Sequence, residues 1–268
     1  MLRVRIMRLV CLTLAAVFVS VSGLFAQGSN SVVNMSHYDL MRPDFERMAQ
    51  QGVVGVIHES SYPRNVRDDK YFGRQIAATN AGLLWGAYHY ADATNPTAQA
   101  DFFLNTVASA WRGAVSGGRP DQVLLVLDFE KNGHYPGGTM RVDQAVAFGE
   151  RVRERTGIHP GLYSGEYRLR ALMKSATPAQ RSALSQCWLW IANYHYQPGS
   201  MPPWDEWSMW QYTGDGKCDL RPRSTYPVSV ANVSRAERNI FRGSPTALRD
   251  FWRKHGWSPG GRGEAPEP

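Results

Sequence analysis

One apolar run, Val123 to Leu127, contains no polar residue and ends directly in Asp128-Phe129-Glu130. Such a run of leucine and β-branched residues predicts a strand that is buried on both faces, the pattern of a parallel sheet. Because side chains alternate along a strand, Asp128 and Glu130 are predicted to point the same way, with Cα atoms roughly 6.5 Å apart. Paired carboxyls at this spacing are typical of glycosidic-bond hydrolysis, although a solvated strand end is the alternative.

The chain as a whole alternates strand patterns with helix patterns, which predicts an α/β fold with a parallel sheet. After about residue 164 there is little room for helices between the last strands, so the arrangement should be irregular there. The final helix is expected to pack on the outside. We expect strands at 31–35, 53–57, 83–90, 123–127, 161–164, 188–193, 208–212 and 227–233, and helices at 43–51, 67–80, 96–112, 139–155 and 244–254.

The first 26 residues are typical of a secretory signal, because three arginines precede an apolar run, Leu9 to Val19, and small residues follow it. Cleavage after Ala26 is expected, and an uncleaved membrane anchor is the alternative. Residues 27–257 then form one domain and 258–268 a disordered tail. The mature protein should be secreted or periplasmic, without stable membrane insertion.

Charge and cysteine content limit the possible partners and linkages. Loss of the leader lowers the formal net charge of +7 by three, and the absence of a basic repeat argues against a nucleic-acid partner. Cys11 lies in the leader, which leaves Cys187 and Cys218 as a predicted disulfide in an oxidising compartment. Neither cysteine has a metal-type motif around it, so the pair is interpreted as structural.

Several motifs, in order along the chain, resemble those of glycoside hydrolase family 25, the muramidases that cleave peptidoglycan. The resemblance runs from about Val32 to Trp252 and implies an irregular (β/α) barrel of the TIM type, with fewer helices in its C-terminal part. The motifs are Ser36-His37-Tyr38, Gly86-Ala87-Tyr88-His89-Tyr90, Gln99-Ala100-Asp101-Phe102-Phe103, Leu127-Asp128-Phe129-Glu130, Trp210-Gln211-Tyr212 and Glu237-Arg238-Asn239-Ile240-Phe241-Arg242-Gly243.

The resemblance also implies roles for the two acids. Glu130 matches the general acid, and Asp128 matches a second carboxylate that stabilises an oxazolinium formed by the substrate's own N-acetyl group, with retention of configuration. The spacing alone cannot choose between retention and inversion. Asn34 and Glu237 depart from the family pattern, which usually has an acidic residue at the first place and Asp at the second, so activity could be reduced or redirected. Asn34 could touch substrate directly or act as a strand-end amide that orients Asp128.

Further site residues are expected at strand ends, where a barrel builds its active site. For Tyr88 and Trp210, core packing is as plausible as sugar stacking. His37 and His89 lack clustered metal-binding spacing, so no required metal or cofactor is expected. The predicted substrate-binding residues are Asn34, His37, Tyr38, Tyr88, His89, Tyr163, Asn193, Tyr194, Trp210, Gln211 and Glu237.

Three functions remain open at this point. The first is a monomeric, secreted muramidase that acts on peptidoglycan. The second is a catalytically weakened barrel that binds wall glycan, which the uncharged Asn34 motivates. The third is a glycosidase of other specificity, such as on chitin, although Leu124 and Val126 stand where the classical chitinase pattern has further acids.

Overall fold

The computed structural model describes residues 28–260 apart from residues 116 and 134. The predicted leader, 1–26, and residues 261–268 of the predicted tail lie outside this part of the chain. Of the tail, Ser258 is anchored, because its hydroxyl donates to the carbonyl of Asp121 at 2.6 Å. Within the described residues, no helix has the length and apolar character needed to span a membrane.

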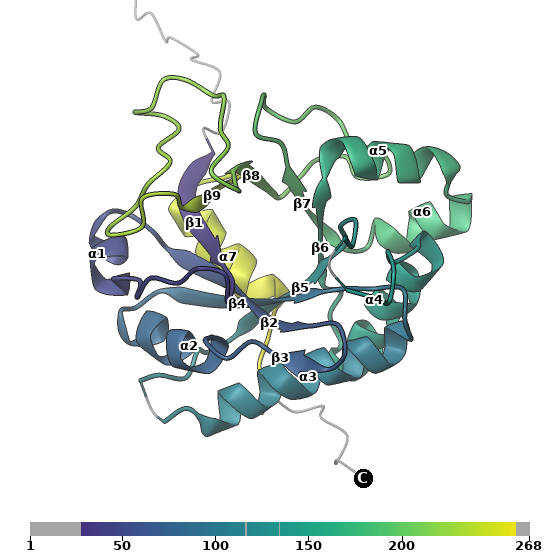
Figure 1. The fold of residues 1–268 in the computed structure, drawn as a ribbon, viewed down its shortest axis with the longest axis horizontal. Helices are drawn as coiled ribbons and strands as arrows, with labels where there is room; N and C mark the ends of the chain where they lie inside the picture. The colour runs from purple at the N-terminus through teal and green to yellow at the C-terminus, as the bar shows by residue number, and fades with distance from the viewer. Residues whose placement is uncertain (1–27, 116, 134, 261–268) are drawn as a thin grey trace, which may run out of the picture.

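Eight strands form a closed barrel, because β1 pairs with both β2 and β9 (Figure 1). Neighbouring strands are parallel from β1 to β8, and β9 is antiparallel to both of its neighbours. The expected TIM-type α/β barrel is thereby confirmed. The barrel strands are β1 Ser29–Met35, β2 Gly55–Tyr62, β4 Leu84–Tyr90, β5 Val123–Asp128, β6 Gly161–Gly165, β7 Trp188–Ala192, β8 Met209–Thr213 and β9 Glu237–Phe241, and two short strands, β3 Val66–Arg67 and β10 Gly256–Trp257, pair with β2 and β5.

Helices surround the first part of the barrel, and loops connect β7, β8 and β9, as the sequence pattern predicts. Local sequence defines several helix starts. In α3, for example, Asn95 accepts hydrogen bonds from the amides of Thr97 and Ala98, and Pro96 occupies the first turn. The helices are α1 Phe45–Gln50, α2 Tyr71–Asn80, α3 Pro96–Gly113, α4 Val142–Thr156, α5 Glu166–Ser175, α6 Pro178–Leu184 and α7 Pro245–His255. The sequence pattern did not predict α5 or α6.

Side-chain alternation divides the buried residues into two cores. Leu124 and Val126 of β5 belong to a cluster inside the barrel, whereas Leu125 and Leu127 belong to the larger cluster between the sheet and the helices. Both sets are fully buried, which explains why the run has no polar break. The same alternation decides which side chains beyond the strand ends can reach the mouth of the barrel.

The expectation that the last helix packs on the outside is wrong. Leu248 and Trp252 of α7 join the cluster inside the barrel. The Trp252 indole donates to the carbonyl of Trp85 at 2.8 Å, near the start of β4. A Cβ on Gly55, at the start of β2, would lie 2.9 Å from the Trp252 ring. Helix α7 therefore closes the amino end of the barrel, which needs an apolar cover there.

The last strand also differs from its predicted position, since β9 is Glu237–Phe241 and residues 227–233 do not form a barrel strand. Val230 and Val233 pair only in an isolated bridge, and Ala231 between them has a φ of 50°. This left-handed turn breaks the extended run. Both valines are buried against the core, which accounts for the apolar pattern that resembled a strand.

The predicted disulfide is wrong, because both Cys187 and Cys218 are free thiols. Cys187 directly precedes β7 and is buried, with its sulfur next to Gly149 of α4, whereas Cys218 follows β8. Since β7 and β8 are parallel neighbours, the two residues lie at opposite ends of the barrel. The Cys218 sulfur instead accepts a hydrogen bond from Arg223 at 3.2 Å.

Candidate active site

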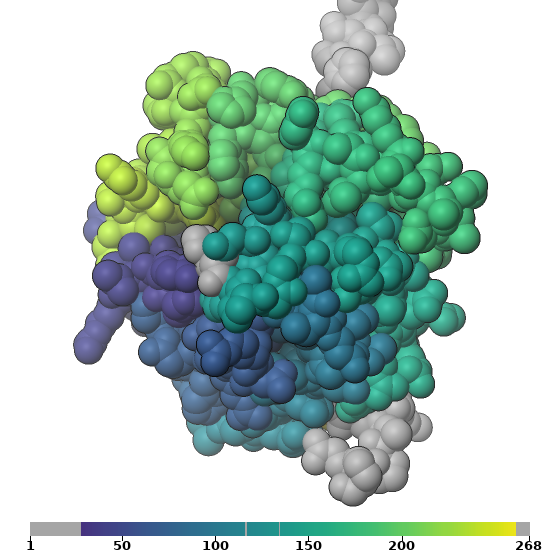
Figure 2. All heavy atoms as spheres, turned by 45° about the vertical axis from the view of Figure 1, so that its right-hand side comes forward, coloured from purple at the N-terminus to yellow at the C-terminus, as the bar shows by residue number. Residues whose placement is uncertain are grey.

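A cavity of about 260 Å³ lies at the carboxyl ends of the strands. Figure 2 shows the purple N-terminal part, the teal middle and the yellow-green C-terminal part of the chain meeting on one face, and residues from all three line the cavity. Its lining is rich in carboxyl and phenol groups. The lining residues are Asn34, Ser36, Tyr38, Glu59, Tyr88, Tyr90, Asp128, Glu130, Lys131, Tyr135, Tyr163, Trp190, Tyr194, Asp215 and Glu237.

Asp128 and Glu130 both line this cavity. Asp128 is the last residue of β5, and Phe129 is fully buried in the outer core. The Phe129 amide donates to Tyr163 O at 2.9 Å, and its carbonyl accepts from the Ser164 hydroxyl at 2.8 Å. These bonds continue the alternation beyond the end of β5, which returns Glu130 to the side of Asp128.

Both acids hold their protons more tightly than in water. Burial raises the pKa of Glu130 to about 6; the charge of Asp215 adds to this effect, and the Arg168 guanidinium opposes it. Burial raises the pKa of Asp128 well above its ordinary value, and the charges of Glu130, Glu59 and Glu237 raise it further. Asp128 Oδ1 is buried and has no hydrogen-bond partner among the described residues.

The floor of the cavity is an amide network around Asn34. Its side-chain nitrogen donates to Glu237, and its oxygen accepts from Asn239 at 2.9 Å and Gln211 at 3.1 Å. Burial raises the pKa of Glu237 to about 8. Asn34 therefore orients Glu237 in the described structure, rather than Asp128, while its side chain still borders the cavity.

Two predicted site residues lie behind the lining. Gln211 is buried and accepts hydrogen bonds from the hydroxyls of Tyr163, at 2.6 Å, and Tyr194, at 2.9 Å. Asn193 donates to Glu166 at 2.7 Å and accepts from the amide of His195 at 2.9 Å. Both hold the wall in place. The predicted residues that line the cavity itself, beside the two acids, are Asn34, Tyr38, Tyr88, Tyr163, Tyr194 and Glu237.

The predictions for His89 and Trp210 are wrong. His89 is buried between the sheet and the helices, where its ring bonds to Ser61 at 2.9 Å and Gln99 at 3.2 Å, and burial lowers its pKa to about 4. The Trp210 indole donates to Asn193 O at 2.8 Å and the ring belongs to the outer core. Each is adjacent in sequence to a residue that faces the barrel interior, so alternation turns it away.

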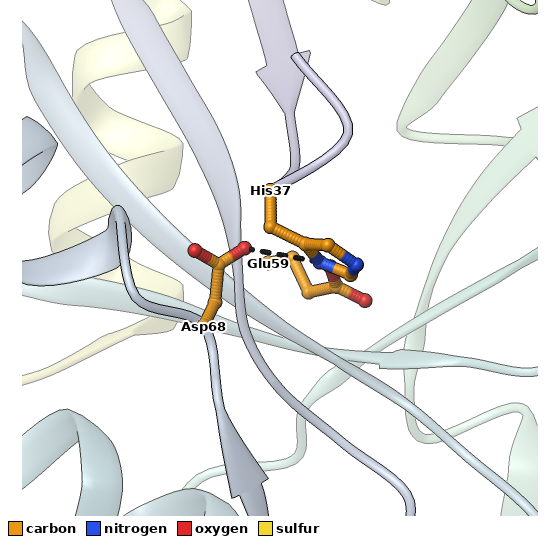
Figure 3. Close-up of side chains that lie close together, drawn as sticks. All are labelled: His37, Glu59 and Asp68. Carbon is orange, nitrogen blue, oxygen red and sulfur yellow. Dashed lines mark hydrogen bonds and ion pairs between the residues drawn. The ribbon is translucent and has the colours of Figure 1, made fainter. Parts of the chain in front are cut away.

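His37 lies beside the cavity rather than in its lining. Its Nδ1 is 2.5 Å from Glu59 Oε2 and 3.5 Å from Asp68 Oδ2 (Figure 3). Burial raises the pKa of Glu59 to about 8, with the charge of Asp68 adding to the effect. Glu59 was not predicted as a site residue, although it too is an acid at the end of an apolar strand, the signal that identified Asp128.

Other missed residues had weaker signals. Tyr90 belongs to the motif Gly86-Ala87-Tyr88-His89-Tyr90; it comes two residues after Tyr88 and therefore lies on the same face of β4. Tyr135 and Asp215 come from loops, where no strand periodicity indicates a direction. Asp215 sits at a φ of 52°, in a turn after β8, and its amide contacts Glu237 Oε1 at 3.5 Å.

Comparison with known proteins places this site in a family. The model of glycosyl hydrolases family 25 matches residues 33–219. Lysozyme M1 of Streptomyces globisporus is 27% identical over 197 residues, which cover 69% of this chain and 58% of that protein. The autolytic lysozyme of Clostridium acetobutylicum is 35% identical over 65 residues, 24% of this chain and 20% of that protein. The chain thus spans little more than half of Lysozyme M1.

Solved structures share the fold. The bacterial lysozyme from Streptomyces coelicolor superimposes with a TM-score of 0.65 at 23% identity, covering 85% of this chain and 98% of that one. A muramidase from Trichobolus zukalii gives a TM-score of 0.62 at 20% identity, covering 83% and 98%. Since the family model spans well over half of the sequence, this chain belongs to glycosyl hydrolases family 25, as its motifs had indicated.

Proposed function

We propose that this protein is a muramidase that hydrolyses the β-1,4 bond between N-acetylmuramic acid and N-acetylglucosamine in peptidoglycan. Glu130 is the general acid, and Asp128 stabilises the positive intermediate. The observation that carries this proposal is that both carboxyls line one cavity at the carboxyl end of the barrel. The names of the relatives, lysozyme and muramidase, support the choice of substrate.

The proposed first step uses the proton on Glu130. As the bond between the anomeric carbon and the glycosidic oxygen breaks, Glu130 gives its proton to that oxygen, and the substrate's N-acetyl oxygen bonds to the anomeric carbon. Water then attacks the anomeric carbon of the resulting oxazolinium, and the bond from that carbon to the N-acetyl oxygen breaks. Glu130 takes a proton from the attacking water. A pKa of about 6 leaves a protonated fraction of Glu130 near neutral pH.

Asp128 suits the second role because it lines the cavity and its Oδ1 has no hydrogen-bond partner among the described residues. It is free to accept the N-acetyl N–H and to face the oxazolinium charge. The charge of Glu130 makes the largest charge contribution to the raised pKa of Asp128, so Asp128 loses its proton more readily while Glu130 still carries its own. The positive charge that develops on the substrate would lower the pKa of Asp128, and the ionised carboxylate would then face that charge.

The phenol-rich wall would bind the sugars. Tyr88, Tyr163 and Tyr194 line the cavity beside the acids, and the latter two are fixed through Gln211. Rings held in this way offer both a flat face and a hydroxyl to a saccharide. We propose further that the protein is exported to the cell exterior or periplasm by its first 26 residues and acts there as a monomer without nucleic acid.

The test is the clearing of a suspension of purified peptidoglycan. Wild type should clear it, and Glu130→Gln should lower the rate by about 10²–10⁴-fold, the usual contribution of a general acid. Glu206→Gln is the matched control, because Glu206 is an exposed partner of Arg242. A wild-type rate no higher than that of Glu130→Gln would favour the second candidate, a glycan-binding barrel, which the uncharged Asn34 at the cavity floor supports.

A further inference from the structure

A cluster of three side chains beside the cavity combines imidazole and carboxylate groups, which metal sites use. The imidazole of His37 and the carboxylates of Glu59 and Asp68 offer atoms that all lie within 4.8 Å of one another. Figure 3 shows the three side chains converging from the turn after β1, from β2 and from the segment between β3 and α2. We propose that His37, Glu59 and Asp68 bind a divalent metal ion, with Zn²⁺ the ion that fits best.

The cluster contains an oxygen without a hydrogen-bond partner. Asp68 Oδ2 accepts no hydrogen bond among the described residues, and the Asp68 side chain is 0% exposed, so water does not reach this oxygen either. The same oxygen lies 3.5 Å from His37 Nδ1. The other oxygen of Asp68 accepts from the Lys70 amide at 2.8 Å, which fixes the carboxylate. A buried carboxylate oxygen is costly to leave unpaired, and a bound cation would satisfy it.

Two of the ligand separations can be compared with those around a small ion. Two ligands ~2.1 Å from a tetrahedral ion lie ~3.4 Å apart. The 3.5 Å between His37 Nδ1 and Asp68 Oδ2 already matches this separation. The 2.5 Å between His37 Nδ1 and Glu59 Oε2 is a direct hydrogen bond, and it must open by about 1 Å. His37 can make that movement because its side chain is 21% exposed and lies on a turn.

The surroundings fix the backbone around the site. Lys70 donates to His37 O, and Arg74 donates to Ser36 O at 3.0 Å, so both cations are engaged with the turn that carries His37. Asp39 lies beside them and offsets part of their charge. A ligand set of one imidazole nitrogen and two carboxylates favours Zn²⁺ over Ca²⁺ or Mg²⁺, which prefer oxygen ligands alone.

The site adjoins the cleft without depending on the proposed hydrolysis. Glu59 borders the cavity, but His37 and Asp68 do not. Three protein ligands leave a fourth position of a tetrahedral ion for water or a ligand oxygen. Because the site is defined by binding, its test uses no glycan, and its failure would leave the proposed muramidase activity untouched.

The experiment is calorimetric titration of ZnCl₂ into chelator-treated, dialysed protein, with CaCl₂ in a parallel titration. We expect one Zn²⁺ per chain with a Kd below about 10 μM. His37→Ala and Asp68→Asn should each weaken binding at least tenfold. Both variants should keep the wild-type circular dichroism spectrum. Co²⁺ should give visible absorption of a tetrahedral site with wild type and lose it with His37→Ala.

His195→Ala is the matched control. His195 pairs with Asp219 at 2.6 Å, like His37 with Glu59, but this pair is exposed and joins no three-ligand cluster among the described residues. Zn²⁺ affinity should be unchanged in His195→Ala. The proposal is overturned if no Zn²⁺ binds up to about 1 mM, if folded His37→Ala and Asp68→Asn bind as wild type does, or if Ca²⁺ binds as tightly as Zn²⁺.

Discussion

At the scale of single residues, the environment of the acids decides the chemistry. The sequence places Asp128 and Glu130 two residues apart, but it does not reveal that Asp215, from a distant loop, is the charge that most raises the pKa of Glu130 after burial. Arg168 on α5 acts in the opposite direction. The pH range in which Glu130 retains its proton is therefore a property of the folded cavity.

The activity should fall as pH rises through about 6, because the proposed mechanism uses protonated Glu130. Asp215→Asn removes a negative charge, which lowers the pKa of Glu130, so the alkaline limb of the kcat/KM profile should move to lower pH. Asn also tolerates the φ of 52° at this position. The measurement is the pH profile of peptidoglycan clearing for both proteins. An unshifted limb would show that Asp215 does not act on the proton donor.

Whether a strand residue lines the cavity could be predicted from side-chain alternation. Tyr88 lines the cavity, whereas its neighbour His89 contacts helices α3 and α4, and alternation alone excludes both facing inward. The same rule applied to β2 would have added Glu59. Asp215 and Tyr135 could not be predicted, because they come from loops whose course depends on contacts distant in sequence.

At the scale of elements, the parallel strands were predictable and the closing elements were not. The run of β5 could be recognised because it is apolar on both faces. Helix α7 has the periodicity of any amphipathic surface helix, and nothing in that pattern shows that Leu248 and Trp252 pack inside the barrel. The apolar residues of 227–233 suggested the last strand, but a turn at Ala231 interrupts them. The strand itself, β9, begins only at Glu237.

The role of α7 as the closure of the barrel predicts a large loss of stability on truncation of its tryptophan. Trp252→Ala should lower the free energy of unfolding by about 3–5 kcal/mol, since it leaves a cavity at the end of the interior core. Arg249→Ala, at an exposed position of the same helix, should change it by less than about 0.5 kcal/mol. Urea unfolding measures both. Equal effects would mean that α7 does not close the barrel.

At the scale of the whole molecule, the barrel brings a cavity together from segments that span the described chain, and no covalent link is needed to hold them. Asn34 and Glu237, over two hundred positions apart, meet at the cavity floor. The disulfide prediction failed at this scale, because the sequence gives only the separation of Cys187 and Cys218 and not the opposite ends of the barrel on which they lie.

The free thiols lead to a prediction for the protein purified without its leader. Alkylation in denaturant, without reductant, should modify both Cys187 and Cys218, and a reducing agent should leave the melting temperature unchanged. The modified mass of the intact chain provides the readout. If two alkyl groups are added only after treatment with a reductant, the two cysteines form a disulfide, which would contradict the free-thiol arrangement.

The central claim is that Glu130 and Asp128 make this barrel a muramidase. Mass spectrometry of the fragments released from purified sacculi tests it most directly, because it identifies the sugar at the new reducing end. The account predicts N-acetylmuramic acid at that end with wild type and no such fragments with Glu130→Gln. Reducing-end N-acetylglucosamine, anhydro-sugar products, or undiminished release by Glu130→Gln would contradict it.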